Sequence, residues 1–425
     1  AFAADVVPVS GNAQRFTVKD VPVLNIVAPN PAGVSHNRFV DYNVQSAGLV
    51  LNNAVAAGRS KLAGQLPANP QFSGRAAGLI LNEVTSRKPS HISGPQEVFG
   101  RAADYVLANP NGITVNGASF INTPRASFVV GSPELEDGKL KRLTTFNGAN
   151  PLNVGERGVS NSAGALDLIA PRISTHGTLT ARDDLNVLIG QNRLRYADAA
   201  IESSGRASAR PVDAQLLGAM QAGRINIIST ADGAGVKIAA PLTARGNLKV
   251  TSAGNLSISG NPEPVRTRIS STNGDVALAA HNDLTLSAVE VQGRAIDASA
   301  GRHLRLEAKT RKSQSQQQES WKKKVLFITT ETYDKTTTQI DVEHVGTQLK
   351  ARTDLTLKAG GDLQLSASSA SAGRNLHATA GRDLRLSALN DSQTTSETLN
   401  HRKGLWRGDY DTSRTTETAR ASSLS

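Results

Sequence analysis

GDVALAAHNDLTLSAVEVQGRAIDASAGRHLRLEA, residues 274–308, nearly repeats itself after 20 residues, and this repeat is the strongest indication of the fold. The repeat matches Val276 with Ile296, Leu284 with Leu304, Leu286 with Leu306 and Ala288 with Ala308. Within each copy, apolar and polar residues alternate over short runs, which is the pattern of a strand with one buried face. Gly, Asn, Asp and His separate the runs, so each copy predicts short strands joined by corners.

A unit this short cannot bury its own apolar face and has to stack on the next copy. The repeat therefore predicts an all-β solenoid, a parallel β-helix whose strands lie about 4.8 Å apart. The composition agrees, because aromatic residues make up 4% of the chain and methionine occurs once. The 425 residues exceed the roughly 250–300 residues at which a single globular core stops growing. A one-dimensional stack has no such limit.

The net charge of +11 and the absence of cysteine narrow the classes of function. Lysine and arginine are scattered, without the aromatic interleaving of nucleic-acid surfaces, so we expect no nucleic-acid partner. A chain without cysteine has no disulfide and no thiolate metal site. The eight histidines show no metal-ligand spacing, and we expect neither a metal nor a cofactor.

Two features bear on the location of the protein. No run approaches the roughly 18 apolar residues of a membrane span. The sequence Ala1-Phe2-Ala3 before Ala4-Asp5 is similar to the end of a signal peptide's cleavage site, which predicts export beyond the inner membrane.

The chain divides into three predicted regions. Residues 1–60 lack the repeat and contain proline-bearing β segments suited to edge strands, so they predict an N-terminal β cap. Residues 61–225 contain short strands at irregular spacing, and the segment from Gly131 to Arg157 is expected to leave the stack. Residues 226–425 form the regular repeats. Ala214 to Ala222, with the sequence AQLLGAMQA, is the best candidate for a short helix.

From Gly223 onward the expected register becomes regular. Three pairs are predicted to follow one another 20 residues apart, namely Val236 with Ile238, Leu256 with Ile258, and Val276 with Leu278. Leu355, Leu363, Leu376 and Leu384 continue the repeat at a spacing of 21. Polar inserts at about 310–346 and 391–425 resemble each other and favour protruding β-hairpins. We expect the second hairpin to be cut off by the end of the chain, and the full-length protein to continue.

Asn109-Pro110-Asn111-Gly112 has the composition of a type I turn and leads directly into a strand. Alone, it indicates only a corner. The run from Asn109 to Arg125, NPNGITVNGASFINTPR, followed by Gly131-Ser132-Pro133, resembles the secretion domain of two-partner-secretion exoproteins. This is the family of filamentous haemagglutinin and the CdiA-type contact-dependent growth inhibition proteins.

Further segments resemble the same family in the family's order, over about residues 20–230. They are Ser35-His36-Asn37 with Phe39, Val50-Leu51-Asn52-Asn53, Leu81-Asn82-Glu83-Val84 and Met220-Gln221-Ala222-Gly223-Arg224-Ile225. The later repeats are similar to haemagglutinin repeats. Some relatives carry cysteines where this chain has Val115 and Ala118, so that pair has no such role here.

The resemblance implies a right-handed β-helix whose N-terminal domain is recognised by a TpsB- or CdiB-type β-barrel transporter in the outer membrane. The residues that it marks for secretion are Asn52, Asn53, Asn82, Asn109, Pro110, Asn111, Gly112 and Ile113. An asparagine at a solenoid corner often bonds the adjacent backbone, so a structural role is favoured for Asn82. For the turn, contact with the transporter and support of the fold are equally open.

Coils contact only their neighbours, so a chain that emerges N-terminus first adds one coil at a time. Our hypothesis is that coil addition outside the cell drives transport outward. Docking by strand addition to a transporter sheet is a further possibility.

Two weaker signals lie in the expected hairpins. Arg407-Gly408-Asp409 is a tripeptide of cell-adhesion ligands, but so short a match arises easily by chance. The run Lys322-Lys323-Lys324 fits lipopolysaccharide or a sulfated glycan, although a solvated surface is the simpler interpretation.

The favoured function is a non-enzymatic, monomeric scaffold that carries a distal toxin or adhesin, with the CdiA type slightly preferred. The alternative is a β-helix polysaccharide lyase or glycosidase, which needs paired carboxylates in one groove. The acids Asp283, Asp362 and Asp383 fall where turns favour aspartate, and the corner of the coil after Asp283 carries His303 instead. No catalytic residue is therefore assigned.

Overall fold

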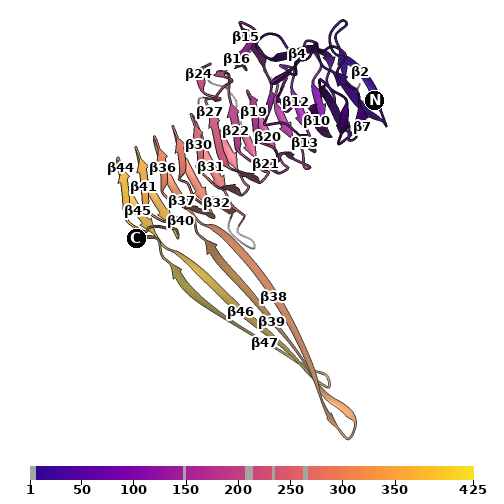
Figure 1. The fold of residues 1–425 in the computed structure, drawn as a ribbon. Coiled ribbons are helices and arrows are strands. Elements are labelled where there is room, and N and C mark those ends of the chain that lie inside the picture. The colour runs from indigo at the N-terminus through magenta and orange to yellow at the C-terminus, as the bar shows by residue number, and fades with distance from the viewer. Residues whose placement is uncertain (1–5, 147–149, 206–213, 232–234, 262–266) are drawn as a thin grey trace.

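The structure of the protein is a computed structural model that describes residues 6–146, 150–205, 214–231, 235–261 and 267–425. Across these ranges it contains 48 strands and no helix. Most strands form three long sheets that run side by side along the molecule (Figure 1). The prediction of an all-β fold is confirmed.

Consecutive strands alternate between the three long sheets. Sheet 1 consists, in order, of β1 (Val7–Pro8), β4 (Val34–Asp41), β8 (Leu79–Val84), β11 (Asp104–Ala108), β14 (Arg125–Val129), β19 (Ala165–Ala170), β22 (Asp184–Ile189), β27 (Arg224–Ser229), β30 (Leu248–Ser252), β33 (Val276–Ala280), β36 (Ile296–Ala300), β41 (Asp354–Ala359) and β44 (Asn375–Ala380). Sheet 2 consists of β2 (Gln14–Val18), β3 (Val21–Asn25), β5 (Leu49–Asn53), β10 (Pro95–Gly100), β13 (Ala118–Ile121), β18 (Val159–Asn161), β21 (Leu179–Ala181), β26 (Met220–Ala222), β29 (Leu242–Ala244), β32 (Thr267–Ser271), β35 (Val289–Gly293), β40 (Gln348–Ala351), β43 (Ser369–Ala372) and β48 (Ser423–Leu424). Sheet 3 consists of β9 (Ser90–Ile92), β12 (Ile113–Val115), β17 (Leu152–Val154), β20 (Ile173–Thr175), β25 (Ala214–Leu216), β28 (Gly235–Ile238), β31 (Asn255–Ser259), β34 (Leu284–Ser287), β37 (Leu304–Glu307), β42 (Leu363–Ser366) and β45 (Leu384–Ser387).

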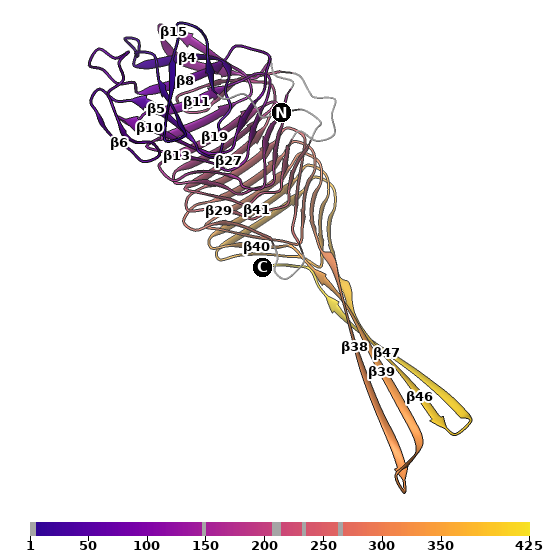
Figure 2. The same cartoon turned by 90° about the vertical axis from the view of Figure 1, so that its right-hand side faces the viewer.

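Each coil of the chain passes from sheet 1 to sheet 3 and then to sheet 2. Strands β33, β34 and β35 make one such coil, and each pairs in parallel with the strand that follows it in the same sheet, β36, β37 and β40. Because every strand bonds the strands of the coils before and after it, the chain winds as a parallel β-helix (Figure 2).

The predicted register is confirmed in most of the repeats. Val276 pairs with Ile296 and Leu284 with Leu304. The spacing of 21 is also confirmed, because Leu355 pairs with Leu376 and Leu363 with Leu384.

One predicted step in this register is wrong. Leu256 does not continue to Val276, because Leu256 lies in sheet 3 and pairs with Leu284, whereas Val276 lies in sheet 1 and pairs with Leu248. Asn247 and Asp275 occupy equivalent corners of two successive coils and are 28 residues apart in the sequence. A constant spacing of 20 residues therefore leads from a strand of sheet 3 to a strand of sheet 1.

A continuous apolar interior runs through the stacked coils. Leu256, Leu284, Leu304 and Leu363 follow one another in sheet 3, and all are 0–1% exposed. Burying a leucine side chain contributes about 1.5–3 kcal/mol. The N-terminal coils also hold a cluster of aromatic side chains, formed by Phe39, Tyr42, Tyr105, Phe120 and Phe128.

Antiparallel pairs cover the N-terminal ends of sheets 1 and 2. Strand β1 pairs with β4, and β2 with β3, both antiparallel. These pairs occupy backbone groups that a free edge would leave for another chain. The parallel stack already includes β3, β4 and β5, and the division of the chain at residues 60 and 225 stays a prediction.

Two small sheets lie outside the stack near the N-terminus. Sheet 4 is antiparallel and contains β15 (Ser132–Glu136), β16 (Lys139–Thr144), β23 (Asn192–Arg195) and β24 (Ile201–Ser204), and sheet 6 contains β6 (Gly58–Ser60) and β7 (Gly64–Leu66). The predicted excursion from Gly131 is confirmed for β15 and β16. It is wrong for Leu152–Val154, which returns to the stack as β17.

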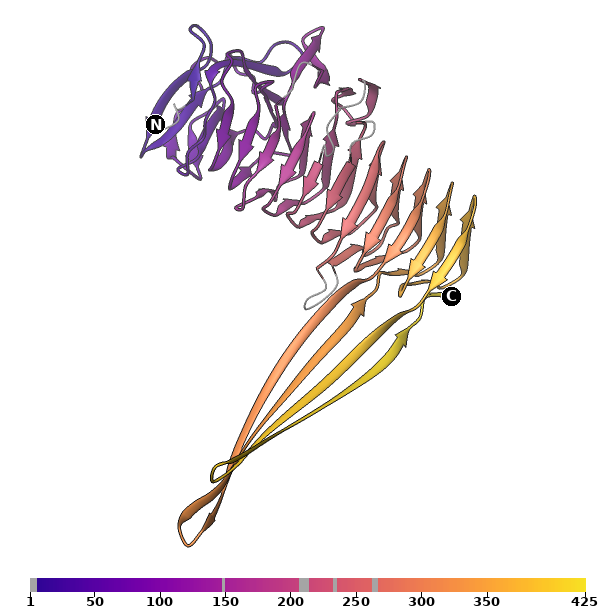
Figure 3. The same cartoon turned by 180° about the vertical axis from the view of Figure 1, so that it is seen from behind.

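Two long hairpins leave the corner between sheets 3 and 2, in two coils that are separated by one coil in which β42 is followed directly by β43. They are β38 (Lys309–Val325) with β39 (Ile328–Val345), and β46 (Leu389–Lys403) with β47 (Trp406–Arg420). Both predicted hairpins are confirmed, and pairing of β39 with β46 joins them into one four-stranded sheet, here called the ribbon (Figure 3). The expectation that the second hairpin is cut off is wrong, because the chain returns to the stack and β48 pairs with β43.

The predicted helix at Ala214–Ala222 is also wrong. Ala214–Leu216 and Met220–Ala222 are two strands, β25 and β26, in neighbouring sheets. Ala214 and Leu216 are buried while Gln215 is exposed. This alternating burial, which is typical of a strand, outweighs the helix propensity of the segment.

Candidate functional site

The turn that begins at Asn109 joins β11 to β12 at the corner between sheets 1 and 3. The side chain of Asn109 is fully buried. Its Nδ2 donates to the carbonyl oxygen of Lys88 at 3.0 Å and to Oγ of Ser90 at 2.9 Å, both in the preceding coil. Its Oδ1 accepts the backbone N–H of Asn111 at 2.9 Å. Asn109 therefore ties one coil to the next and also shapes its own turn.

The rest of the turn continues these ties. Asn111 donates through Nδ2 to the carbonyl oxygen of Ser86 at 2.8 Å. Gly112 has a φ of 109°, in the region that favours glycine, and Ile113 is 1% exposed. Only Pro110 and Asn111 are partly exposed, so these two form the outer surface of the turn.

Asn52 and Asn53 perform the same task at the end of β5. Nδ2 of Asn52 donates to Oδ1 of Asn25 at 2.9 Å and to the carbonyl oxygen of Pro67 at 3.2 Å. Nδ2 of Asn53 donates to the carbonyl oxygens of Ala77 at 3.0 Å and Arg101 at 2.8 Å, and its Oδ1 accepts the N–H of Ala77 at 2.8 Å. Both side chains are fully buried, so they cannot be reached from outside the fold.

Asn82 differs from the other asparagines. It lies within β8, paired with Asn37 and Leu107, and not at a corner. Its side chain is fully buried, and within the described ranges neither Oδ1 nor Nδ2 has a hydrogen-bond partner. The expectation that Asn82 bonds the adjacent backbone at a corner is therefore wrong, and its buried amide makes no compensating bond.

The predicted secretion residues thus occupy neighbouring coils, but not one patch. Asn52 and Asn53 lie in sheet 2, Asn82 in sheet 1, and the turn at Asn109 at the corner between sheets 1 and 3. Three of them, Asn52, Asn53 and Asn109, share a buried amide bonded to the backbone or side chains of adjacent segments. Their chemistry is that of coil-to-coil support.

The prediction from sequence missed two residues that do the same work. Nδ2 of Asn69 donates to the carbonyl oxygens of Ile26 and Asn52, both at 2.8 Å. Glu97 is 4% exposed and accepts from Oγ of Ser60 at 2.7 Å and from the N–H of Lys61 at 2.8 Å. The dipeptide Asn69-Pro70, which repeats Asn109-Pro110, is a signal that could have identified the first of them.

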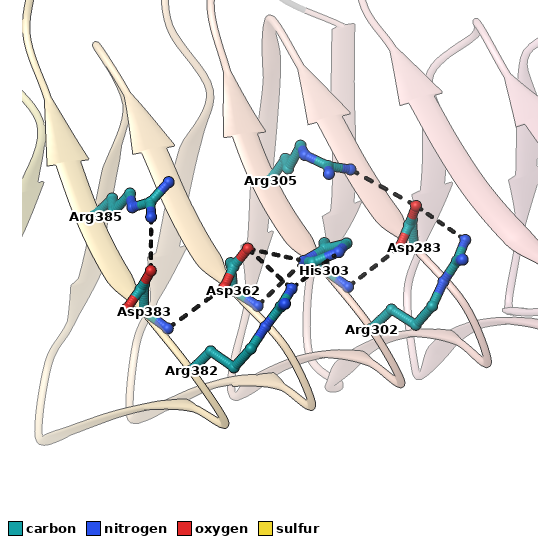
Figure 4. Close-up of polar contacts among 8 residues, drawn as sticks. All are labelled: Asp283, Arg302, His303, Arg305, Asp362, Arg382, Asp383 and Arg385. Carbon is teal, nitrogen blue, oxygen red and sulfur yellow. Dashed lines mark hydrogen bonds and ion pairs between the residues drawn. The ribbon is translucent and has the colours of Figure 1, made fainter.

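Two of the corner acids of the enzyme alternative, Asp283 and Asp362, form ties between coils, and the carboxylate of the third, Asp383, pairs within its own coil (Figure 4). Oδ1 of Asp283 accepts the N–H of His303 at 3.2 Å, and Oδ1 of Asp362 accepts the N–H of Asp383 at 3.4 Å. Each acid also meets an arginine, with 3.2 Å from Asp283 to Arg302, 3.2 Å from Asp362 to Arg382 and 2.6 Å from Asp383 to Arg385. Carboxylates that are held in this way brace the corners.

The tripeptide Arg407-Gly408-Asp409 lies in an extended strand. Arg407 is opposite Arg402 and Asp409 is opposite Asn400 in β46. The indole of Trp406 covers Gly408, because a Cβ added there would meet Cη2 of Trp406 at 2.4 Å. This packing explains in structural terms why position 408 is a glycine. Adhesion through the tripeptide stays a prediction.

Neither a metal centre nor a spanning helix is found in the described part of the chain. No group of three or more His, Cys, Asp or Glu residues there is arranged to hold a metal ion. No helix within those ranges is long and apolar enough to cross a membrane.

Two family models match this chain, one in its N-terminal part and one in its C-terminal part. The family model of the TPS secretion domain matches residues 4–258, and that of the hemagglutinin repeat matches residues 320–402. A hemolysin of Proteus mirabilis is 39% identical over 99% of this chain, and a hemolysin of Serratia marcescens is 35% identical over 100% of this chain. A CdiA of Escherichia coli, described as a toxin, is 38% identical over 66% of the chain.

The chain spans only part of these relatives, 27% and 28% of the two hemolysins and 9% of the CdiA protein. Among solved structures, it is similar to the secretion domain of filamentous hemagglutinin. That match has a TM-score of 0.56 and 29% identity, and it covers 70% of this chain and 97% of the other. Nothing in these comparisons supports a polysaccharide lyase or glycosidase.

Proposed function

Since the chain belongs to the family of two-partner-secretion exoproteins, through a TPS secretion domain at residues 4–258, we propose that this domain addresses it to one cognate outer-membrane transporter. Proteins of this family are exported to the cell surface or beyond it, and this chain is part of such an exported protein. The matched domain serves secretion and is not an enzyme domain. We further propose that the stack has no catalytic activity of its own.

The single observation that carries the proposed mechanism is the route of the chain through the three sheets. Within the three long sheets, each parallel strand pairs only with strands of the coils before and after it, as β36 pairs with β33 and β41. A coil that has just left the transporter can therefore fold on the stack without waiting for distant segments. Each coil buries apolar side chains as it forms, and the free energy released biases the transport outward.

The asparagine motifs support this mechanism by fixing the N-terminal coils. Asn53 and Asn109 satisfy backbone and side-chain groups of neighbouring segments that would otherwise stay unpaired in the interior. We propose that they act in secretion through the fold of the docking domain, and that any direct contact with the transporter at this turn is made by Pro110 and Asn111. The docking mode we favour is that a still extended segment of this chain adds as a strand to a sheet edge of the transporter.

Asn109→Asp tests this division of roles. The substitution keeps the acceptor for Asn111 but removes the two donors to Lys88 and Ser90. Because it also buries a charge, we expect the secretion domain to lose about 2–4 kcal/mol of stability and export to fall in parallel. Thermal unfolding of the purified chain and immunoblots of the medium, with the transporter co-expressed, measure the two effects.

Pro110→Ala is the matched control, since it alters the outer surface of the same turn. We expect stability within about 1 kcal/mol of the wild type and unchanged export. Export that fails for Asn109→Asp at wild-type stability, or for a stably folded Pro110→Ala, would show that the turn itself is read by the transporter.

For the whole protein, we propose a fibre whose distal end carries the activity. The hemolysins match nearly all of this chain, ribbon included, whereas the CdiA proteins match 56–72% of it. This difference favours a hemolysin-type activity over the CdiA type that the sequence slightly preferred. Lysis of erythrocytes by the full-length exported protein, compared with growth inhibition of neighbouring bacteria, distinguishes the two.

A further inference from the structure

The two hairpins of the ribbon end in apolar tips. Leu326 and Phe327 connect β38 to β39 and are 87% and 99% exposed. Leu405, in the turn between β46 and β47, is fully exposed. Such side chains are normally removed from water, and a group of them at the end of a protruding element marks a surface that meets a partner.

The backbone at the first tip makes these residues more unusual. Leu326 and Phe327 have φ angles of 48° and 68°, which bulky side chains rarely adopt. The hairpin of β15 and β16 uses Asp137 and Gly138 at the same two positions, with φ of 51° and 73°. The chain therefore has a better-suited turn elsewhere, and the ribbon tip holds two large apolar residues in an unfavourable conformation. Strain of this kind points to a function for the side chains.

Basic residues surround both tips. Lys322, Lys323 and Lys324 precede the first turn, and Arg402, Lys403 and Arg407 flank the second. The nearest acid, Glu331, is 8% exposed and accepts the hydroxyl of Tyr333 at 2.5 Å, which lowers the pKa of Glu331 to about 2. Lys323 and Lys403 lie 3.8 Å and 3.4 Å from this carboxylate. Asp409 is the other acid beside the second turn, and the balance of charge at the tips is positive.

An aromatic row lies directly behind the tips. Trp321 stacks on Tyr333 with ring centroids 5.3 Å apart, and Tyr333 stacks on His401 at 4.2 Å. The ring of Trp406 meets His401 edge-on at 5.3 Å. These contacts cross from one hairpin to the other, so both tips point the same way, at the end of the ribbon far from the stack (Figures 1 and 2).

We propose that the tips of the ribbon bind the surface of an anionic phospholipid bilayer. Leu326, Phe327 and Leu405 enter the boundary between headgroups and acyl chains, and the tryptophans lie at headgroup level, where amphipathic rings are favoured. The lysines and arginines meet the phosphates, and this complementarity selects a lipid surface over an uncharged partner. This proposal goes beyond secretion and does not depend on it.

The whole chain is suited to a direct test, because its two tryptophans, Trp321 and Trp406, both lie in the aromatic row behind the tips. Titration with vesicles of equal parts phosphatidylcholine and phosphatidylglycerol is expected to shift tryptophan emission to shorter wavelength. The protein is expected to sediment with these vesicles and to bind pure phosphatidylcholine at least about 10-fold more weakly, since each basic residue contributes roughly 5-fold at low salt. No shift and no co-sedimentation with anionic vesicles would overturn the proposal.

Replacing the apolar turn supplies a variant that should still fold. Leu326→Asn with Phe327→Gly creates the turn sequence that the observed φ angles favour, so the ribbon is expected to form at least as well as before. Its affinity for the anionic vesicles is expected to fall at least about 10-fold, because the inserted side chains are lost. Val55→Asn, at another exposed apolar residue on the stack, is the control and should bind like the wild type.

Two further outcomes also decide the question. Binding to lipopolysaccharide micelles without binding to the phospholipid vesicles contradicts the proposal, and so does self-association through the tips in analytical ultracentrifugation without vesicle binding. Wild-type affinity of the Leu326→Asn, Phe327→Gly variant places the contact elsewhere on the chain and likewise overturns it.

Discussion

Leu304→Asp is expected to reduce export of the chain by at least about 10-fold. Leu304 is 0% exposed and lies between Leu284 and Leu363 in sheet 3. The change removes a buried side chain, which alone costs about 2–5 kcal/mol, and leaves a carboxylate in an interior that offers it no partner. Because each coil folds on its predecessor, the coils after Leu304 lose the template on which they build. Immunoblots of medium and periplasm measure the loss. Asp at Leu284 or Val276 should act in the same way.

Thr285→Asp is the control for this experiment. Thr285 lies on the outer face of β34, beside Arg305 of the next coil, so the new carboxylate faces solvent and a cation. We expect export within about twofold of the wild type, in keeping with the small effects of surface substitutions. Wild-type export of a Leu304→Asp chain would contradict the proposed link between coil folding and transport.

Asp167→Ala is expected to destabilise the N-terminal half of the stack by about 3–5 kcal/mol, because it breaks a buried ion pair. Oδ2 of Asp167 lies 2.6 Å from Nε of Arg125 and 2.7 Å from Oγ of Ser127, and its side chain is fully buried. Burial acts to lower the pKa of Arg125, but Asp167, Tyr196 and Asp104 together outweigh that effect and the pKa of Arg125 is raised. Arg125 in turn donates to the carbonyl oxygen of Tyr196 and lies over its ring, which holds sheet 4 against sheet 1.

Asp184→Ala removes an aspartate that pairs at 2.7 Å with Arg224 of the next coil, where the Arg224 side chain is 67% exposed and that of Asp184 is 34% exposed. A loss of at most about 1 kcal/mol is expected for such a surface pair. Urea unfolding followed by circular dichroism compares the two variants. Equal losses for Asp167→Ala and Asp184→Ala would mean that the buried pair does not hold sheet 4 in place.

The repeat of 20 or 21 residues was sufficient to predict the fold, because in a parallel β-helix the residues that stack also recur in the sequence. Leu284 and Leu304 show this directly. The same logic failed between Leu256 and Val276. These two residues lie in different sheets, because paired residues in these two coils are 28 residues apart instead of 20 or 21. It also failed at Ala214–Leu216, where burial between two neighbouring strands decided the conformation of residues that favour a helix.

The pairing of the two hairpins and the roles of the asparagines needed the structure. The hairpins are far apart in the sequence and meet because they leave the same corner of the stack, in coils that are two apart. Asn109 was identified by its turn, but its partner Ser90 lies in another coil, and no local pattern specifies that contact. Asn82 is also an asparagine, but its side chain makes no hydrogen bond to the described residues. The residue type alone therefore did not predict the role.

Disulfide trapping shows directly whether the exported chain is wound into coils of this register. The chain contains no cysteine, and Thr285 and Arg305 face outward in adjacent paired strands, so cysteines placed there are within bonding distance at a strand spacing of about 4.8 Å. We predict that protein recovered outside the cell with Thr285→Cys and Arg305→Cys forms the disulfide nearly completely. Thr285→Cys with Gln364→Cys, two coils apart, should not form it. Absence of the first disulfide, or equal formation of the second, would contradict the account.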